Sequence, residues 1–134
     1  MAGTQRNCAG GVTPWGTWVT CEEVNSEREL KEEQLHGYNF EVTLSAEPGL
    51  MKPVPLREMG RFRHEAVAVD PRSGVVYETE ALGDGLLYRF MPKEPGNLAA
   101  GGKLQAMSVQ GRPQPDTRNW PGTDAFPVGV PMAV

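Results

Sequence analysis

Apolar and polar residues alternate along several short stretches of the chain. In residues 37–44, GYNFEVTL, four apolar side chains alternate with polar ones, and this period of two predicts a half-buried β-strand. Strands are also predicted for residues 65–70, 75–80 and 86–91. The sequences DPRSG and GDG between them are typical of tight turns. Three short strands joined by such turns predict an antiparallel meander.

The remaining segments give weaker patterns. Two more strands are predicted, for residues 17–21 (TWVTC) and 103–110 (KLQAMSVQ). Residues 47–58 contain three prolines and are expected to form an extended connection. The charged stretch 25–34 has the spacing of a helix capping box, and both a short surface helix and a solvated loop remain open for it. The proline-rich sequence from residue 112 onward is expected to be mostly loop.

Many short antiparallel strands with little helix indicate an all-β fold, which is a sandwich, a barrel or a propeller. A propeller blade takes about 40–50 residues, so the 134 residues hold two to three blades, and closure needs about four. The chain also begins close to its richest motif and ends on the apolar sequence FPVGVPMAV. We therefore expect residues 1–134 to form one partial propeller domain that is a fragment of a longer chain.

Composition and charge narrow the function classes. The net charge of −4 and the pI near 5.2 argue against a nucleic-acid-binding surface, which would be basic. No run approaches the roughly 18–20 apolar residues of a membrane span. The first residues, MAGTQRN, lack the apolar core of a signal peptide. Two cysteines do not decide the redox compartment.

The densest chemistry lies in residues 6–23, RNCAGGVTPWGTWVTCEE, which contain both cysteines and two adjacent carboxylates. If the Thr-Pro-Trp-Gly turn folds this segment back on itself, a thiol and a carboxylate meet, as in a metal site. Adjacent strand residues point to opposite faces, so at most one of Glu22 and Glu23 faces such a site. Alternation alone does not choose between the two carboxylates.

Each candidate also has a purely structural interpretation. Cys8 could be a small buried hydrophobe or half of a Cys8–Cys21 disulfide, and Cys21 within its strand is expected to be core. Glu65 could be a surface carboxylate at the start of its strand. The two histidines, His36 and His64, are expected to be hydrogen-bonded structural residues rather than metal ligands.

The sequence resembles the PhoX-type alkaline phosphatases, a bacterial family whose members are several times longer. The resemblance is carried, in the family's order, by RNCAGGVTPWGTWVTCEE, HGYNFEV, MGRFRHEAVAVDPRSGVVYETE, GLLYRFMP and DTRNW, and it extends from residue 6 to about residue 120. It implies a six-bladed propeller that binds iron and calcium and hydrolyses small phosphate monoesters through a metal-bound oxygen nucleophile. It also implies a periplasmic or secreted protein whose export signal precedes this chain.

The resemblance further implies four metal ligands: Cys8, as an iron ligand, together with Glu23, Glu65 and Glu80. Of the adjacent pair, Glu23 is therefore the candidate, and Glu22 is expected to be solvated or to lie in an outer shell. The chain departs from the family at Ala81, where an aspartate is common. Metal content in this chain could therefore be altered or lost.

Two other functions stay open beside a phosphatase. Ala81 favours a non-catalytic propeller that serves as a structural or binding platform. Another propeller hydrolase, such as a calcium-dependent lactonase, is the third reading, because fold alone does not fix chemistry. For the phosphatase we expect the chain to be inactive alone, because a partial propeller lacks ligands and closure. Exposed strand edges at its ends favour self-association.

Overall fold

A computed structural model describes residues 3–24, 34–118, 120–123 and 126–134. Within these ranges the chain forms seven β-strands and two single-turn 3₁₀ helices. Their bounds are β1 Asn7–Val12, β2 Thr17–Glu22, β3 Asn39–Thr43, η1 Arg57–Met59, β4 His64–Val69, β5 Val76–Glu80, β6 Leu87–Pro92, η2 Leu98–Ala100 and β7 Gly102–Ala106. The helix or loop predicted for residues 25–34 lies outside the described residues except for Gln34. No helix in the described ranges is long and apolar enough to cross a membrane.

Each strand predicted from the sequence is present, with ends that shift by a few residues. The largest shift is in β7, which ends at Ala106 instead of continuing to residue 110. The extended connection predicted for residues 47–58 is wrong at its end, because η1 begins at Arg57. Strand β1 was not predicted, since its two glycines weaken a strand pattern and Gly10 has a φ of 66°.

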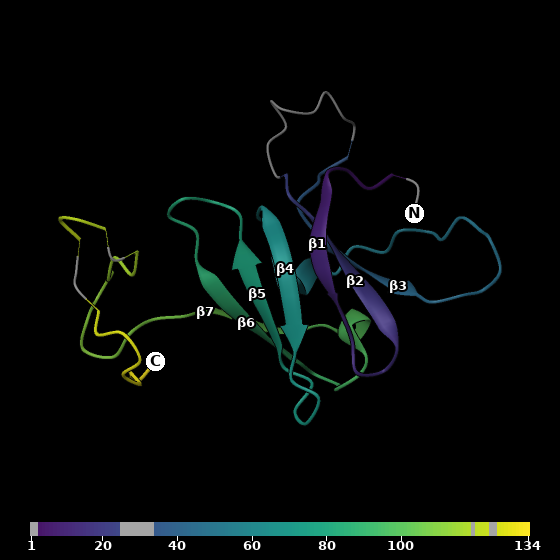
Figure 1. The fold of residues 1–134 in the computed structure, drawn as a ribbon. Coiled ribbons are helices and arrows are strands. Elements are labelled where there is room, and N and C mark those ends of the chain that lie inside the picture. The colour runs from purple at the N-terminus through teal and green to yellow at the C-terminus, as the bar shows by residue number, and fades with distance from the viewer. Residues whose placement is uncertain (1–2, 25–33, 119, 124–125) are drawn as a thin grey trace.

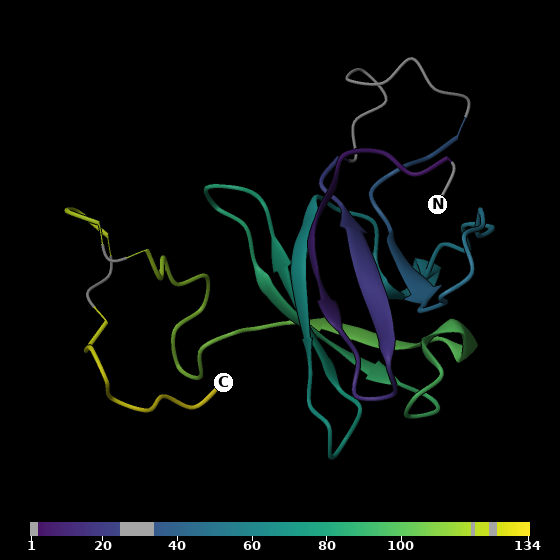
Figure 2. The same cartoon turned by 45° about the vertical axis from the view of Figure 1, so that its right-hand side comes forward.

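The strands form one curved sheet in the order β3-β2-β1-β4-β5-β6-β7 (Figure 1). Strands β1, β2 and β3 pair antiparallel, and so do β4, β5, β6 and β7. We call these the first and second units. The units meet where β1 pairs with β4 in parallel, with Gly10 opposite Ala66. Figure 2 shows the two units turned toward each other around this junction.

Two glycines allow the close approach of strands at the junction. A Cβ atom on Gly11 would lie 2.2 Å from the Val67 carbonyl oxygen on β4. One on Gly10 would lie 2.1 Å from the Val19 carbonyl oxygen on β2. Strand β1 therefore fits between its two neighbours only because these positions have no side chain.

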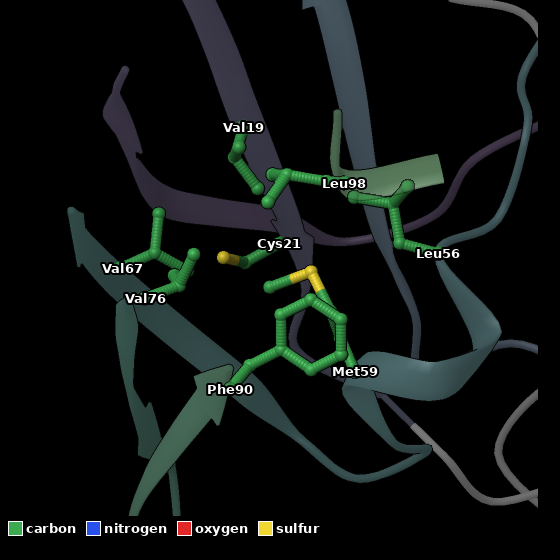
Figure 3. Packing of buried hydrophobic residues seen from close by; sticks show 8 residues of the cluster. All are labelled: Val19, Cys21, Leu56, Met59, Val67, Val76, Phe90 and Leu98. Carbon is green, nitrogen blue, oxygen red and sulfur yellow. The ribbon is translucent and has the colours of Figure 1, made fainter. Parts of the chain in front are cut away.

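The core lies between the two units rather than within either (Figure 3). Val19 and Cys21 of β2 pack against side chains of β4, β5 and β6, and against the segments around η1 and η2. The other buried members of this cluster are Leu56, Met59, Val67, Val76, Phe90 and Leu98. Because each unit supplies part of one apolar cluster, the units stabilise each other.

Candidate metal centre

Three of the four predicted ligands converge. Cys8 lies on β1, Glu23 directly follows β2, and Glu65 lies on β4. One ligand atom from each lies within 4.8 Å of those from the other two, and all three residues are half-buried. The Cys8 thiol donates a hydrogen bond to Glu65 Oε1 at 3.2 Å. We call these three residues the acidic cluster.

Strand register explains this convergence. Cys8 is paired with Cys21 across β1 and β2. Glu23 comes two residues after Cys21, so its side chain lies on the same face of the sheet as that of Cys21 and near Cys8. The Glu23 amide also donates to the Arg6 carbonyl oxygen at 3.0 Å, which continues the ladder past the end of β2. The parallel pairing of Gly10 with Ala66 brings Glu65 beside β1. Three segments far apart in sequence thus meet at the junction of the two units.

The acidic cluster favours a bound positive charge. The hydrogen bond to Glu65 raises the pKa of the Cys8 thiol, and the negative charges of Glu65 and Glu23 add to this effect. The negative charge of the two carboxylates therefore favours a proton on the Cys8 sulfur. A metal cation at the same place would offset that negative charge as well. One sulfur and two carboxylates are also a donor set that metals use, with oxygen suiting hard cations such as calcium and a thiolate favouring iron or zinc. The residues present fit a metal ion.

Glu80 is not one of the converging residues. It ends β5, and its carboxylate accepts hydrogen bonds from the Leu86 amide at 3.1 Å and the Tyr88 hydroxyl at 3.2 Å. The next residue, Ala81, donates its amide to the Arg63 carbonyl oxygen at 2.8 Å. These bonds hold Glu80 within the second unit, against the start of β6.

Of the two surroundings expected for Glu22, the solvated one is wrong, and a place in an outer shell stays a prediction. Its side chain is fully buried and accepts hydrogen bonds from the backbone amides of Gln5, Gly37 and Tyr38. His36 Nδ1 lies 2.7 Å from the same carboxylate. The segment that precedes β3 covers Glu22, and a carboxylate suits that place because several inward-pointing donors need an acceptor.

A second buried carboxylate, Glu78 on β5, was missed by the sequence analysis. It accepts a hydrogen bond from Asn39 Nδ2 at 2.7 Å and lies 3.2 Å from His64 Nδ1. Burial raises the pKa of Glu78, while His64 and Asn39 oppose that rise. The available signal was its place on the buried face of a strand, two residues after Val76. His36 and His64 are both hydrogen-bonded, as predicted, His36 to Glu22 and His64 through Nε2 to the Gly60 carbonyl oxygen.

Cys21 lies in the core, as predicted, and both cysteines are free thiols. Burial raises the pKa of Cys21 to about 12. Cys21 is not in the acidic cluster, although it lies next to Cys8 in the ladder. The two cysteines therefore have different surroundings: one borders carboxylates and the other packs against apolar side chains.

The chain is similar to known proteins in both sequence and fold. The family model described as Alkaline phosphatase PhoX matches residues 1–125. The chain is also similar to the solved structure of Pseudomonas fluorescens PhoX in complex with vanadate, a transition state analogue, with a TM-score of 0.58 and 23% identity. That similarity covers 79% of this chain and 27% of the solved one, and it confirms the prediction of a partial propeller. No curated protein matches the chain.

Proposed function

Because this chain belongs to the PhoX family of alkaline phosphatases, we propose that it forms part of a metal-dependent enzyme that hydrolyses phosphate monoesters. The observation that carries the proposal is the acidic cluster, in which Cys8, Glu23 and Glu65 bring ligand atoms within 4.8 Å of one another. Two carboxylates held this close repel each other, and a bound cation would offset that repulsion.

The three residues have distinct roles in this proposal. Glu23 and Glu65 supply hard oxygen ligands, which suit calcium and iron, and Cys8 supplies a thiolate that selects iron over calcium. The bound cations supply positive charge against the dianionic phosphate of a small monoester substrate. Without them the carboxylates of the cluster would repel that substrate.

Glu80 is proposed as a fourth ligand that changes partners when metal binds. Its carboxylate bonds to Leu86 and Tyr88, and both bonds join neighbouring residues of one hairpin. To bind a cation, the Glu80 carboxylate would have to leave both of these partners. Ala81 offers no carboxylate, so the chain has one acidic group fewer beside Glu80 than is common in the family.

Metal binding by the purified chain tests the ligand set. The chain is incubated with iron(III) or with calcium, dialysed and analysed for bound metal, and iron binding is also read from sulfur-to-metal charge-transfer absorption. We expect bound iron in the parent chain, and loss of that absorption in Cys8→Ser. Glu65→Gln should weaken binding by at least about 10-fold, since even outer partners of metal ligands contribute that much.

Glu47→Gln is the matched control, because Glu47 is an exposed carboxylate in the loop after β3. It should bind metal like the parent chain. Equal binding by Cys8→Ser, Glu65→Gln and the parent would contradict the proposed cluster.

The chain alone is proposed to be inactive. The proposal is supported by the coverage, since the chain matches 27% of the solved relative's length and a partial propeller lacks closure. The assay is hydrolysis of 4-nitrophenyl phosphate at alkaline pH with calcium and iron present. Robust turnover that depends on Cys8 would contradict this part of the proposal.

A second candidate function is a non-catalytic propeller platform. The features that favour it are Ala81 in place of an acidic residue, and the commitment of Glu80 to bonds within its own hairpin. Metal analysis separates the two candidates. A chain that binds no metal, or calcium without iron, would favour the platform.

Two further parts of the proposal concern the protein in its setting. We propose that the chain is part of a longer protein that is exported to the periplasm or secreted, in keeping with its family, and cell fractionation tests this. We also propose self-association, because β3 and β7 are the outer strands of the described sheet. Sedimentation velocity over a range of concentrations tests it, and a monomer at every concentration would contradict it.

A further inference from the structure

The two cysteines are direct partners across an antiparallel ladder. Cys8 of β1 is paired with Cys21 of β2, and a register shift follows Cys8 on the way to Gly11. Side chains of directly opposed residues leave the same face of a sheet. Paired Cα atoms in such ladders are about 4.5–5.5 Å apart, and disulfides join Cα atoms about 4.4–6.8 Å apart. The backbone therefore already has the spacing that a disulfide needs.

The two thiols differ in how an oxidant reaches them. Cys8 is half-buried at the acidic cluster, whereas Cys21 is fully buried in the core. A small oxidant in solution meets Cys8 first. The partner within reach of an oxidised Cys8 is then Cys21, because it is the residue opposite in the ladder.

We propose that Cys8 and Cys21 form a reversible cross-strand disulfide, and that this bond withdraws the Cys8 sulfur from Glu23 and Glu65. The oxidant is a small peroxide such as hydrogen peroxide. The disulfide part of the proposal rests on the register of β1 and β2. The loss of a metal ligand rests on the proposed function.

The reaction has two balanced steps. The Cys8 sulfur attacks one peroxide oxygen and the O–O bond breaks. Cys8 becomes a sulfenic acid, and the departing hydroxide takes the Cys8 thiol proton and leaves as water. The Cys21 sulfur then attacks the Cys8 sulfur, the S–O bond breaks, the hydroxyl leaves as a second water with the Cys21 proton, and the S–S bond forms. Two thiols are oxidised and one peroxide is reduced. A dithiol reductant reverses the change.

The structure also sets the metal and the disulfide in competition. A sulfur bonded to Cys21 is no longer a thiolate, so it cannot hold a cation together with Glu23 and Glu65. In the other direction, a cation bound to Cys8 occupies the sulfur that a peroxide would attack. Oxidation should therefore be a property of the metal-free chain, and reduction should restore metal binding.

The test follows thiols and mass in the chain freed of metal by a chelator. The reduced chain is treated with hydrogen peroxide, unfolded, and labelled with N-ethylmaleimide. We expect both thiols to escape labelling, the unlabelled mass to fall by two hydrogen atoms, and a peptide linking the two cysteines to appear after digestion. Dithiothreitol should restore labelling at both positions.

Two variants keep the test decisive. In Cys21→Ala, Cys8 should stop at the sulfenic acid, which dimedone traps. In Cys8→Ala, Cys21 should stay reduced and label fully after unfolding. Circular dichroism confirms that each variant is folded. Peroxide treatment of the parent chain that oxidises Cys8 further while Cys21 remains labelled would overturn the proposal.

A last arm separates this inference from the proposed function. With iron(III) bound beforehand, disulfide formation should slow at least about 10-fold, and the oxidised chain should bind iron at least about 10-fold more weakly. If the disulfide forms but iron affects neither reading, the disulfide stands and the metal assignment of Cys8 fails. If iron binds at Cys8 but no disulfide forms, the metal assignment of Cys8 stands and the disulfide proposal fails.

Discussion

Glu22 and Glu23 are neighbours in sequence with opposite surroundings. Glu22 is fully buried and receives three backbone amides and His36, while Glu23 is half-buried in the acidic cluster. The alternation of a strand explains why they face different ways. One carboxylate holds the fold together, and the other is available to a ligand.

This contrast predicts that one variant loses stability and the other loses metal binding. Glu22→Ala should lower the free energy of unfolding by about 3–5 kcal/mol, because it leaves buried donors and His36 without their acceptor. Glu23→Ala should change it by no more than about 0.5 kcal/mol in the metal-free chain but abolish iron binding. Urea denaturation and metal analysis measure the two effects. Equal loss of stability in both variants would contradict the assignment.

At this scale the sequence was informative about chemistry and less so about burial. The resemblance to the PhoX family singled out Cys8, Glu23 and Glu65, while strand alternation gave only that Glu22 and Glu23 face opposite ways. The burial of Glu22 depends on the segment before β3, which is distant in sequence and carries no pattern that points at Glu22. Glu80 was predicted as a ligand from its matched motif, and it stays a prediction.

At the scale of elements, β1 is a strand that the pattern of apolar and polar residues does not predict. Its sequence, NCAGGV, has no clear alternation, and its glycines are typical of turns. The strand exists because β2 and β4 supply partners on both sides of it. Tertiary pairing thus overrides local propensity at this position.

The close approach at Gly11 gives a prediction for this element. Gly11→Ala should destabilise the chain by about 3 kcal/mol or more, because the added methyl group would overlap the Val67 carbonyl oxygen and must push β1 from β4. Gly49→Ala is the matched control, since a Cβ there meets nothing within 4 Å. Urea denaturation compares them. A Gly11→Ala chain as stable as the control would show that β1 and β4 do not need this contact.

A pH prediction concerns the contact between η1 and β7. The Gly102 amide and then the Lys93 ammonium lower the pKa of Glu58 below its usual value. A carboxylate with a depressed pKa in the folded state adds stability above its unfolded pKa, and this contribution is lost as the pH falls through the folded pKa. Between about pH 6 and pH 3, Glu58→Gln should therefore lose less stability than the parent chain. Chemical denaturation at each pH measures this, and parallel pH profiles would contradict it.

The whole molecule consists of two units that share one core. The sequence predicted the meander of β4, β5 and β6 because turns and alternation are local signals. The parallel pairing of β1 with β4 joins residues that are 56 positions apart (Gly10 and Ala66), and no local signal reports such a pairing. The acidic cluster lies at that junction, so local sequence patterns could not predict its geometry either.

A shared core predicts cooperative unfolding. Phe90→Ala removes a fully buried side chain from the second unit and should cost about 3–5 kcal/mol. Trp15, in the first unit, packs against the same cluster and reports through its fluorescence. Fluorescence and circular dichroism should shift together in urea. A fluorescence transition that stays in place while the circular dichroism transition moves would show that the units unfold separately.

Because the two units meet at the acidic cluster, the stability of this chain should depend on metal ions in the buffer. With the proposed ligands, an ion held by Cys8 and Glu23 on one side and Glu65 on the other is a cross-link that exists only in the folded state. Its contribution grows with the logarithm of free ion concentration, by about 1.4 kcal/mol for each tenfold increase above the dissociation constant. Citrate or EDTA in a storage buffer would thus act on this protein as a mild denaturant, and the melting temperature would fall as chelator is added.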